Sequence, residues 1–127
     1  MTSLDELCRI AEVEFAHIVV GTQGLEAKRR LFIRDGSFVD VWVSSKLPGR
    51  FGFHWERTHL DGTFFRYDNF PDPAWRAVET FPHHFHDGSL DRVISAPFPP
   101  GIAEGFRAFM TFLSSRLPQG TTPTGQQ

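Results

Sequence analysis

The chain has 127 residues, a formal net charge of −2 and a single cysteine, Cys8. This length is typical of one domain, which we expect to span residues 1–117. The slightly negative charge excludes a protein that binds nucleic acid through an overall basic surface, so a polyanion would have to bind a local patch. One cysteine excludes an intrachain disulfide and a cysteine-based zinc site. No apolar run approaches the roughly 20 residues of a membrane span, and we expect a cytoplasmic protein with no membrane partner.

The N-terminal segment "SLDELCRIAEVE" predicts a helix. Ser3 and Glu6 have the spacing of a capping box, in which each side chain binds the backbone N–H of the other residue. Apolar residues follow at helical spacing in the same segment: Leu4, Leu7, Cys8 and Ala11. The next segment, "FAHIVVG" (15–21), is rich in β-branched residues, which favours a strand.

One signal, Asp-Gly followed by a small hydroxyl residue, then recurs three times. It ends at Ser37, Thr63 and Ser89, and it is typical of the turn of a β-hairpin. The runs between these turns predict strands at 28–34, 38–45, 51–57, 63–70 and about 80–86. Pro82 cannot donate a ladder hydrogen bond, so the last of these strands fits only an edge. We therefore expect an antiparallel, meandering sheet of about five or six strands.

The last third of the chain changes character after "PFPPG" (97–101). The segment "IAEGFRAFMTFLSSRL" (102–117) has an apolar stripe broad enough to cover one face of a sheet. The following residues, 118–127, contain no apolar side chain large enough to anchor them, and we expect them to be disordered. The predicted fold class is α+β, with an N-terminal and a C-terminal helix packed on the sheet.

Hairpin registers predict which polar side chains share a face of this sheet. A three-residue loop at Leu60–Gly62 would place Glu56 opposite Arg66 and His54 opposite Asp68, and would avoid two facing arginines. A three-residue loop around Asp35-Gly36 would place Arg30 opposite Asp40 and Leu31 opposite Val39. A five-residue connection (46–50) would place Trp42 opposite His54 and Asp40 opposite Glu56. The predicted solvent-facing side then carries Trp42, His54, Glu56, Arg66 and Asp68.

This face has two interpretations. Cross-strand ion pairs are common on the solvated side of a sheet, and they would account for Glu56–Arg66 and Arg30–Asp40. His54 opposite Asp68 instead suggests a general base, because a carboxylate orients an imidazole and raises its basicity. Arg66 would stabilise charge on a phosphoryl group, and an exposed Trp42 would stack on a nucleic-acid base.

"TFPHHFHDG" (80–88) contains three histidines with three possible roles. His84 and His86 would point to the same side of a strand and could bind a metal together with His54 or Asp68, although no established ligand motif is present. One histidine could instead act as a general acid, or the imidazoles could simply cap backbone groups. Strand alternation places His83 on the side opposite to His84 and His86.

Four segments together resemble the TumE family of small bacterial and archaeal toxins, over about residues 31–88. They are "LFIRDGSFVDVW", "FGFHWER", "DGTFFRYDN" and "TFPHHFHDG", in this order. The chain differs from the family pattern at Pro71-Asp72-Pro73, at the inserted "AWRAVE" that follows, and at Phe85, where a lysine is common. The residues selected by the resemblance are His54, Trp55, Arg66, Tyr67, Asp68, Asn69, Pro82, His83, His84 and His86.

The resemblance implies the toxin of a type II toxin–antitoxin module, with a cognate antitoxin that is often a helix-turn-helix protein, and with RNA as the substrate. We expect a ribonuclease that needs no metal or other cofactor, because RNA supplies its own nucleophile in the 2′-hydroxyl. His54, oriented by Asp68, would act as the base, Arg66 would stabilise the phosphate, and His83 or His84 would act as the acid. Trp42, Tyr67, Asn69 and His86 would contact the substrate. The alternatives are a non-catalytic module that binds nucleic acid or protein within a toxin–antitoxin complex, and a metal-dependent hydrolase with histidine ligands.

Overall fold

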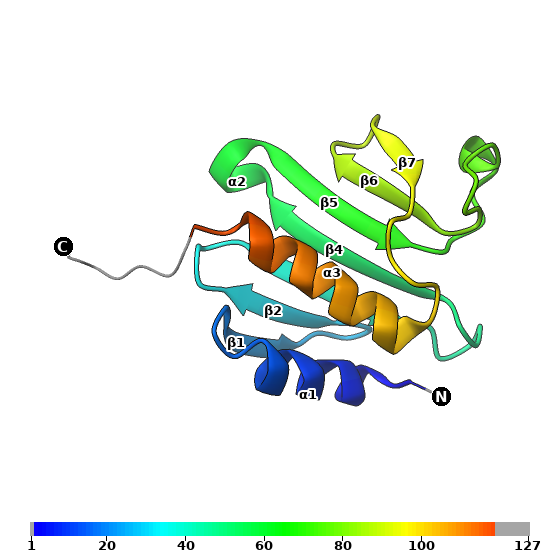
Figure 1. Ribbon diagram of the computed structural model, residues 1–127. Helices are drawn as coiled ribbons and strands as arrows, with labels where there is room; N and C mark the ends of the chain where they lie inside the picture. Colours follow the sequence, from blue (N-terminus) through cyan, green and yellow to red (C-terminus); the bar gives the residue numbers. More distant parts are fainter. Residues whose placement is uncertain (1, 119–127) are drawn as a thin grey trace.

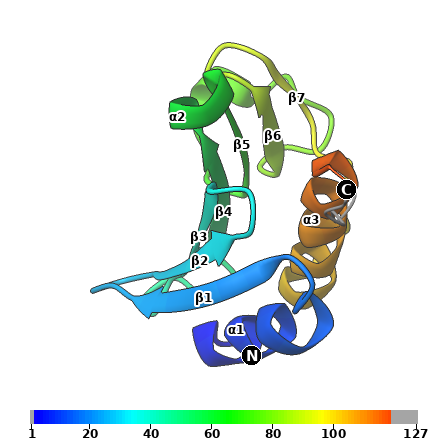
Figure 2. The same cartoon turned by 90° about the vertical axis from the view of Figure 1, so that its left-hand side faces the viewer.

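The computed structural model describes residues 2–118 as one antiparallel sheet with two helices on the same face (Figure 1). The sheet has seven strands, and their spatial order is the order of the chain. It curves around the two helices, as Figure 2 shows from the side. In chain order the elements are α1 (Leu4–Glu14), β1 (Val19–Gly24), β2 (Arg29–Ile33), β3 (Phe38–Val43), β4 (Phe51–Arg57), α2 (Thr58–Asp61), β5 (Thr63–Asp68), the short 3-10 helix η1 (Pro73–Trp75), β6 (His84–Gly88), β7 (Val93–Ser95) and α3 (Ile102–Arg116). The predicted α+β class is confirmed, with one or two strands more than expected.

The core lies between the two helices and the face of the sheet that they cover, here called the inner face. Strands β2 to β6 contribute odd-numbered residues to it, because successive side chains of a strand point to opposite sides. The helices contribute residues spaced by three or four positions. The buried apolar residues of these elements include Leu7, Ile10, Ala11, Leu31, Val39, Val41, Phe51, Phe53, Trp55, Phe65, Tyr67, Phe85, Phe106, Phe109, Met110 and Leu113.

Both helices begin and end close to their predicted limits. The capping box at α1 is confirmed, since the Ser3 hydroxyl accepts from the Glu6 N–H and the Glu6 carboxylate accepts from the Ser3 N–H. Helix α3 is N-capped by Gly101 and ends at Arg116. No helix among residues 2–118 is both long and apolar enough to cross a membrane. Of the expected tail, only Pro118 is among the described residues.

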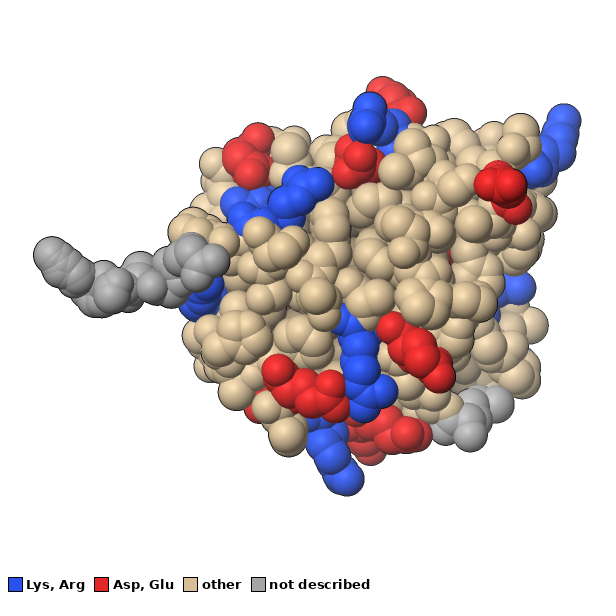
Figure 3. All heavy atoms as spheres, in the orientation of Figure 1, with Lys and Arg blue, Asp and Glu red and all other residues tan. Residues whose placement is uncertain are grey.

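Figure 3 shows the helix-covered side of the molecule. Charged side chains of both signs gather over α1, whereas the middle of this side, over α3, carries few of them. An ion pair between Arg107 of α3 and Glu14 of α1 links the two helices, with an Nε–Oε1 distance of 2.8 Å. The helices thus cover the inner face. The opposite face of the sheet, here called the outer face, is not covered by them.

The first strand starts later than predicted. Residues 15–18 form a turn, and β1 begins at Val19. His17 lies in this turn with an exposed side chain whose Nε2 is 3.2 Å from the Ser114 hydroxyl of α3. It therefore has a structural partner on the helix-covered side of the molecule.

The predicted register of the β2–β3 hairpin is confirmed. Arg30 lies opposite Asp40 and Leu31 opposite Val39. Gly36 has a φ of 92° in the connecting turn, a left-handed conformation that glycine adopts at low cost. This hairpin also carries an ion pair, because the Arg30 guanidinium binds the Asp40 carboxylate through two hydrogen bonds of 2.8 and 3.0 Å.

The other two predicted registers are wrong by two residues. His54 lies opposite Asp40 and Arg66, and Gly52 lies opposite Trp42 and Asp68. The β3–β4 connection is longer than expected because β3 ends at Val43 rather than at residue 45. After β4, residues 58–61 form the helical turn α2, so that the connection spans 58–62 instead of 60–62. A shift of two residues preserves the side to which each side chain points, and the predicted members of the outer face are therefore correct.

The last predicted strand starts later than expected, and one strand was not predicted. Strand β6 begins at His84, so Pro82 precedes it. After Gly88 the chain turns back through residues 89–92 into β7, which has only three residues, Val93–Ser95. β7 pairs with β6, so the strand next to Pro82 is not at the edge of the sheet.

Candidate functional site

The outer face carries rows of polar side chains that cross β3 to β6. In one row, Asp40, His54, Arg66 and His86 lie directly opposite one another on consecutive strands. In the next row, Asp68 lies between Gly52 and His84. Neighbouring strands are about 4.8 Å apart, so these rows bring together side chains that are up to 46 positions apart in the sequence.

His54 is oriented by a carboxylate, but not by the predicted one. Its Nε2 is 2.9 Å from Oε1 of Glu56, which lies two positions further along β4. The second Glu56 oxygen accepts the Thr58 N–H at the start of α2, with a distance of 2.8 Å. Burial opposes the ionisation of Glu56, but the hydrogen bonds from Thr58 and His54 outweigh it and lower the pKa of this carboxyl. A carboxylate can only accept, so the Nε2 of His54 carries hydrogen and the Nδ1 of the neutral ring is free to accept a proton.

Arg66 lies between two histidines, His54 and His86, on the neighbouring strands. Its Nε donates to Oδ2 of Asp68 at 2.9 Å, and 40% of the side chain is exposed. Its terminal nitrogen lies over Gly52, where an added Cβ would be only 3.1 Å away. The absence of a side chain at Gly52 therefore gives the guanidinium room to extend across β4.

Asp68, His84 and His86 form a buried polar cluster, with exposed fractions of 3%, 2% and 5%. Burial is the main reason why the pKa of His86 is lowered, and the nearby His84 contributes to the same shift. Trp75 of η1 packs against both imidazoles, with ring centroids 6.2 Å from His84 and 5.8 Å from His86. Asp68 therefore neighbours His84 and Arg66, and the prediction that it orients His54 is wrong.

Three other predicted site residues, His83, Tyr67 and Asn69, make contacts within the protein that hold the fold together. His83 lies on the inner side, where its ring contacts Phe51 and Tyr67 at centroid distances of 5.8 and 6.0 Å. It is thus separated by the sheet from His54, and it cannot act on the same phosphate as the outer-face residues.

Tyr67 and Asn69 are also engaged within the protein. Tyr67 is fully buried, its hydroxyl donates to the Pro99 carbonyl at 3.0 Å, and burial raises its pKa above the usual range. In this arrangement it is not available to stack on a base. The Asn69 side chain accepts from the Phe51 N–H and donates to the Gly49 carbonyl, and so fastens the connection between β3 and β4.

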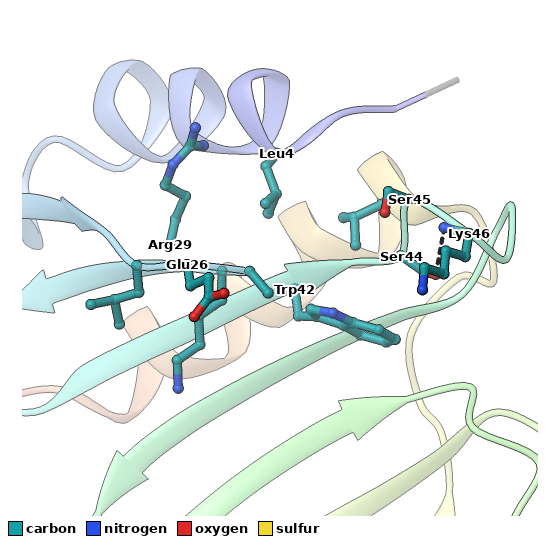
Figure 4. Close-up of a pocket in the computed structure, with 11 residues that line it drawn as sticks. Leu4, Glu26, Arg29, Trp42, Ser44, Ser45 and Lys46 are labelled. Atoms are coloured by element: carbon teal, nitrogen blue, oxygen red, sulfur yellow. Dashed lines mark hydrogen bonds between the residues drawn. The ribbon is translucent and has the colours of Figure 1, made fainter.

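Three hollows follow one another along the outer face and the adjoining end of the sheet. The central one, of about 390 Å³, is lined by Ala27, Lys28, Asp40, Trp42, Gly52, His54 and Arg66. It shares Arg66 with a hollow of about 230 Å³ at the Asp68–His84–His86 cluster. On the other side it shares Lys28 and Trp42 with a hollow of about 430 Å³ beside the start of α1. Figure 4 shows this last hollow, to which α1 contributes Leu4, β3 contributes Trp42, and the segment after β3 contributes Ser44 and Lys46.

Sequence reasoning missed three contributors to this surface. The His54–Glu56 contact could have been found from the i, i+2 spacing, which places both side chains on one face. Gly52 could be recognised only once Arg66 was known to cross it. Trp75 lies in the inserted "AWRAVE", which has neither strand nor helix periodicity, so the sequence gives no signal that it covers the two histidines.

Comparison with known proteins gave one finding. A family model described as Toxin TumE matches residues 4–117, from the start of α1 to the residue after α3. Searches of curated proteins and of solved structures found no match.

Proposed function

Because this chain belongs to the TumE family of toxins, it is the toxin of a toxin–antitoxin pair, and we propose that it acts by cleaving RNA on the outer face of its sheet. The observation that carries this proposal is the pair His54 and Arg66, which lie opposite each other and line one hollow with Trp42. An oriented imidazole can accept a proton, and an exposed guanidinium beside it can stabilise the negative charge of a phosphate.

The central hollow offers the outer end of Arg66 to a phosphate. Its charged lining residues are Lys28, Asp40 and Arg66; Lys28 is paired with Asp40, whereas Arg66 binds Asp68 through its Nε atom. Trp42 adds an aromatic surface on which a base can stack.

In the proposed reaction, Nδ1 of His54 takes the proton of an RNA 2′-hydroxyl. The 2′-oxygen attacks the adjacent phosphorus while Arg66 stabilises the negative charge on the phosphate oxygens. The bond to the 5′-oxygen then breaks, and this oxygen leaves with a proton from a water molecule at the exposed side of Arg66. The His54 imidazolium afterwards returns its proton to the solvent. The products are a 2′,3′-cyclic phosphate and a 5′-hydroxyl end.

The test is to incubate the purified full chain with RNA and to analyse the new ends. We expect His54→Ala to slow cleavage roughly a hundredfold to ten-thousandfold, and Arg66→Gln to slow it roughly a hundredfold to a thousandfold. His17→Ala is the matched control, because His17 is an exposed histidine on the helix-covered side. Intact RNA with the wild-type protein, or equal rates for wild type and His54→Ala, would contradict the proposal.

A non-catalytic toxin would behave differently in cells. If it acted by binding RNA or protein alone, the variant His54→Ala, which loses the base and keeps Arg66, would remain toxic when produced without the antitoxin. We propose a helix-turn-helix protein as the antitoxin, and the gene next to this one provides the check.

A further inference from the structure

The Asp68–His84–His86 cluster combines two imidazoles and a carboxylate within a small volume. One potential ligand atom from each residue lies within 4.8 Å of the other two. Asp68 and His84 face each other across β5 and β6, and His86 follows on the same side of β6. All three side chains are at least nine-tenths buried, so their charges and lone pairs are shielded little by water.

Hydrogen bonds define which nitrogen of each ring carries hydrogen. Nδ1 of His84 lies 3.1 Å from the Pro82 carbonyl, and Nδ1 of His86 lies 3.2 Å from the Leu90 carbonyl. A carbonyl only accepts, so both Nδ1 atoms are donors, and in a neutral ring each Nε2 presents a lone pair. Histidines that bind metals show the same arrangement, with one nitrogen donating to a carbonyl and the other free for the ion.

The contact between His84 and Asp68 has the spacing of two ligands of one cation. Nε2 of His84 is 3.4 Å from Oδ1 of Asp68, and with the neutral ring a lone pair and a carboxylate oxygen face each other in a buried site. A shared proton would draw the two atoms to about 2.7–2.9 Å, the usual length of a charge-assisted hydrogen bond. Two ligand atoms that each lie about 2.1 Å from a tetrahedral zinc ion are about 3.4 Å from one another.

The surroundings hold the carboxylate in place and leave one side open. Oδ1 of Asp68 accepts the Phe70 N–H at 2.8 Å, and Oδ2 accepts from Nε of Arg66 at 2.9 Å. Outer contacts of this kind orient the ligands of metal sites. The positive charge of Arg66 opposes a second cation, but Asp72 lines the same hollow and contributes a negative charge.

We infer that Asp68, His84 and His86 bind one divalent transition-metal ion of the zinc type, with a fourth position open to the adjoining hollow. Two imidazoles favour such an ion over Mg²⁺, which prefers oxygen ligands. Three protein ligands and one open position are typical of catalytic rather than structural zinc sites. This inference follows the alternative of histidine ligands rather than the expectation of a ribonuclease without a metal, and it does not depend on RNA cleavage.

The experiment measures metal binding directly, on the full chain without a histidine tag and after removal of bound metal with a chelator. Zn²⁺ is titrated by calorimetry, and Co²⁺ by the visible absorption that distinguishes tetrahedral from octahedral coordination. We expect one equivalent of either ion, tetrahedral Co²⁺ bands and a higher melting temperature with Zn²⁺. We expect His84→Asn and His86→Asn each to weaken Zn²⁺ binding by about a hundredfold or more, the upper end of the loss caused by changing outer-shell partners.

Asparagine is chosen because its amide nitrogen can replace Nδ1 as the donor to the backbone carbonyl, while the Nε2 ligand is lost. His17→Asn is the matched control and should bind Zn²⁺ like the wild type, and circular dichroism checks that each variant is folded. No binding of Zn²⁺ or Co²⁺ by the folded wild type would overturn the inference, and so would unchanged binding by both His84→Asn and His86→Asn. His54→Ala separates the two proposals, because it should lose RNA cleavage and keep the metal.

Discussion

Ser37 links the side chains of Trp55 and Asp35 below the protein surface. It is almost fully buried, and its hydroxyl accepts from Nε1 of Trp55 at 2.8 Å while donating to the Asp35 carboxylate. Asp35 in turn binds Arg57 at the end of β4. The small hydroxyl residue of the first Asp-Gly turn is therefore part of the core as well as of the turn.

We expect Ser37→Ala to lower the free energy of unfolding by about 1–3 kcal/mol, because it leaves the buried Trp55 N–H without an acceptor. Urea denaturation followed by tryptophan fluorescence provides the measurement. Ser89→Ala is the matched control, since Ser89 follows an Asp-Gly pair in the same way but is exposed. Equal losses for the two variants would show that the Trp55 contact contributes nothing.

Asp40 makes stability depend on pH in the acid range. Burial opposes the ionisation of its carboxyl, but hydrogen bonds from Arg30 and Lys28 outweigh burial and lower the pKa. A carboxyl whose pKa is lower in the folded state stabilises the protein above its unfolded-state pKa of about 3.9, and this contribution is lost as the pH falls further.

We therefore expect Asp40→Asn to lower the free energy of unfolding by roughly 1–2 kcal/mol at pH 7. The variant should also lose less stability than the wild type below about pH 4. Denaturation curves between pH 7 and pH 2.5 check both effects. The control Asp5→Asn removes an exposed ion pair with Arg29 and should change stability by less than about 1 kcal/mol. An identical pH profile for wild type and Asp40→Asn would contradict this assignment.

Among the elements, the hairpin signals and the strand alternation were sufficient to predict which residues share the outer face. The Asp-Gly turns located the hairpins, and errors of two residues in register left each side chain on its predicted side. The pairing itself could not be predicted at the two longer connections. Nothing in "THLD" distinguishes the short helix α2 from a loop, and β7 is too short to show a period. His54 was consequently paired with Asp68 instead of Arg66, although both belong to the correct face.

Strand β4 offers a way to move Arg66 without changing any charge. We expect Gly52→Ala to displace the guanidinium, because the new Cβ would lie 3.1 Å from its terminal nitrogen, whereas the end of a long side chain can shift at little cost in stability. RNA cleavage, if it depends on Arg66, should fall about tenfold or more, since misplacement by about 1 Å can cost a hundredfold in rate.

Rates of RNA cleavage and melting temperatures, measured together, test this expectation. Gly21→Ala in β1 is the control, because the added Cβ there would make only an ordinary contact of 3.7 Å with Phe32. A large loss of stability in Gly52→Ala would show that Gly52 is required by the fold rather than by Arg66.

In the whole molecule, one face of the sheet forms the core and the other carries the candidate site. The apolar side chains of the inner face meet α1 and α3, while His54, Arg66 and the buried cluster lie on the outer face. The cluster could not be predicted with its partners, because its geometry depends on the pairing of β5 with β6 and on Trp75 from an aperiodic segment.

Helix α3 is required to close the core, because four of its apolar residues are completely buried against the sheet. We expect a chain that stops at Gly101 to remain unfolded or to aggregate, since the inner face would then be exposed to water over most of its width. Circular dichroism and size-exclusion chromatography of the shortened chain provide the measurement. A soluble monomer with a cooperative melting transition would contradict this view of α3.

The order of the strands has a consequence for how the protein is made. Each strand pairs with the next one in the chain, so every hairpin can form as soon as its second strand leaves the ribosome, without waiting for distant segments. Helix α3, which emerges after all seven strands, is nevertheless the element that covers the centre of the sheet. A partly synthesised chain can thus have its strands in register while the core is still open, and the toxin acquires its stable shape only after α3 has also been synthesised.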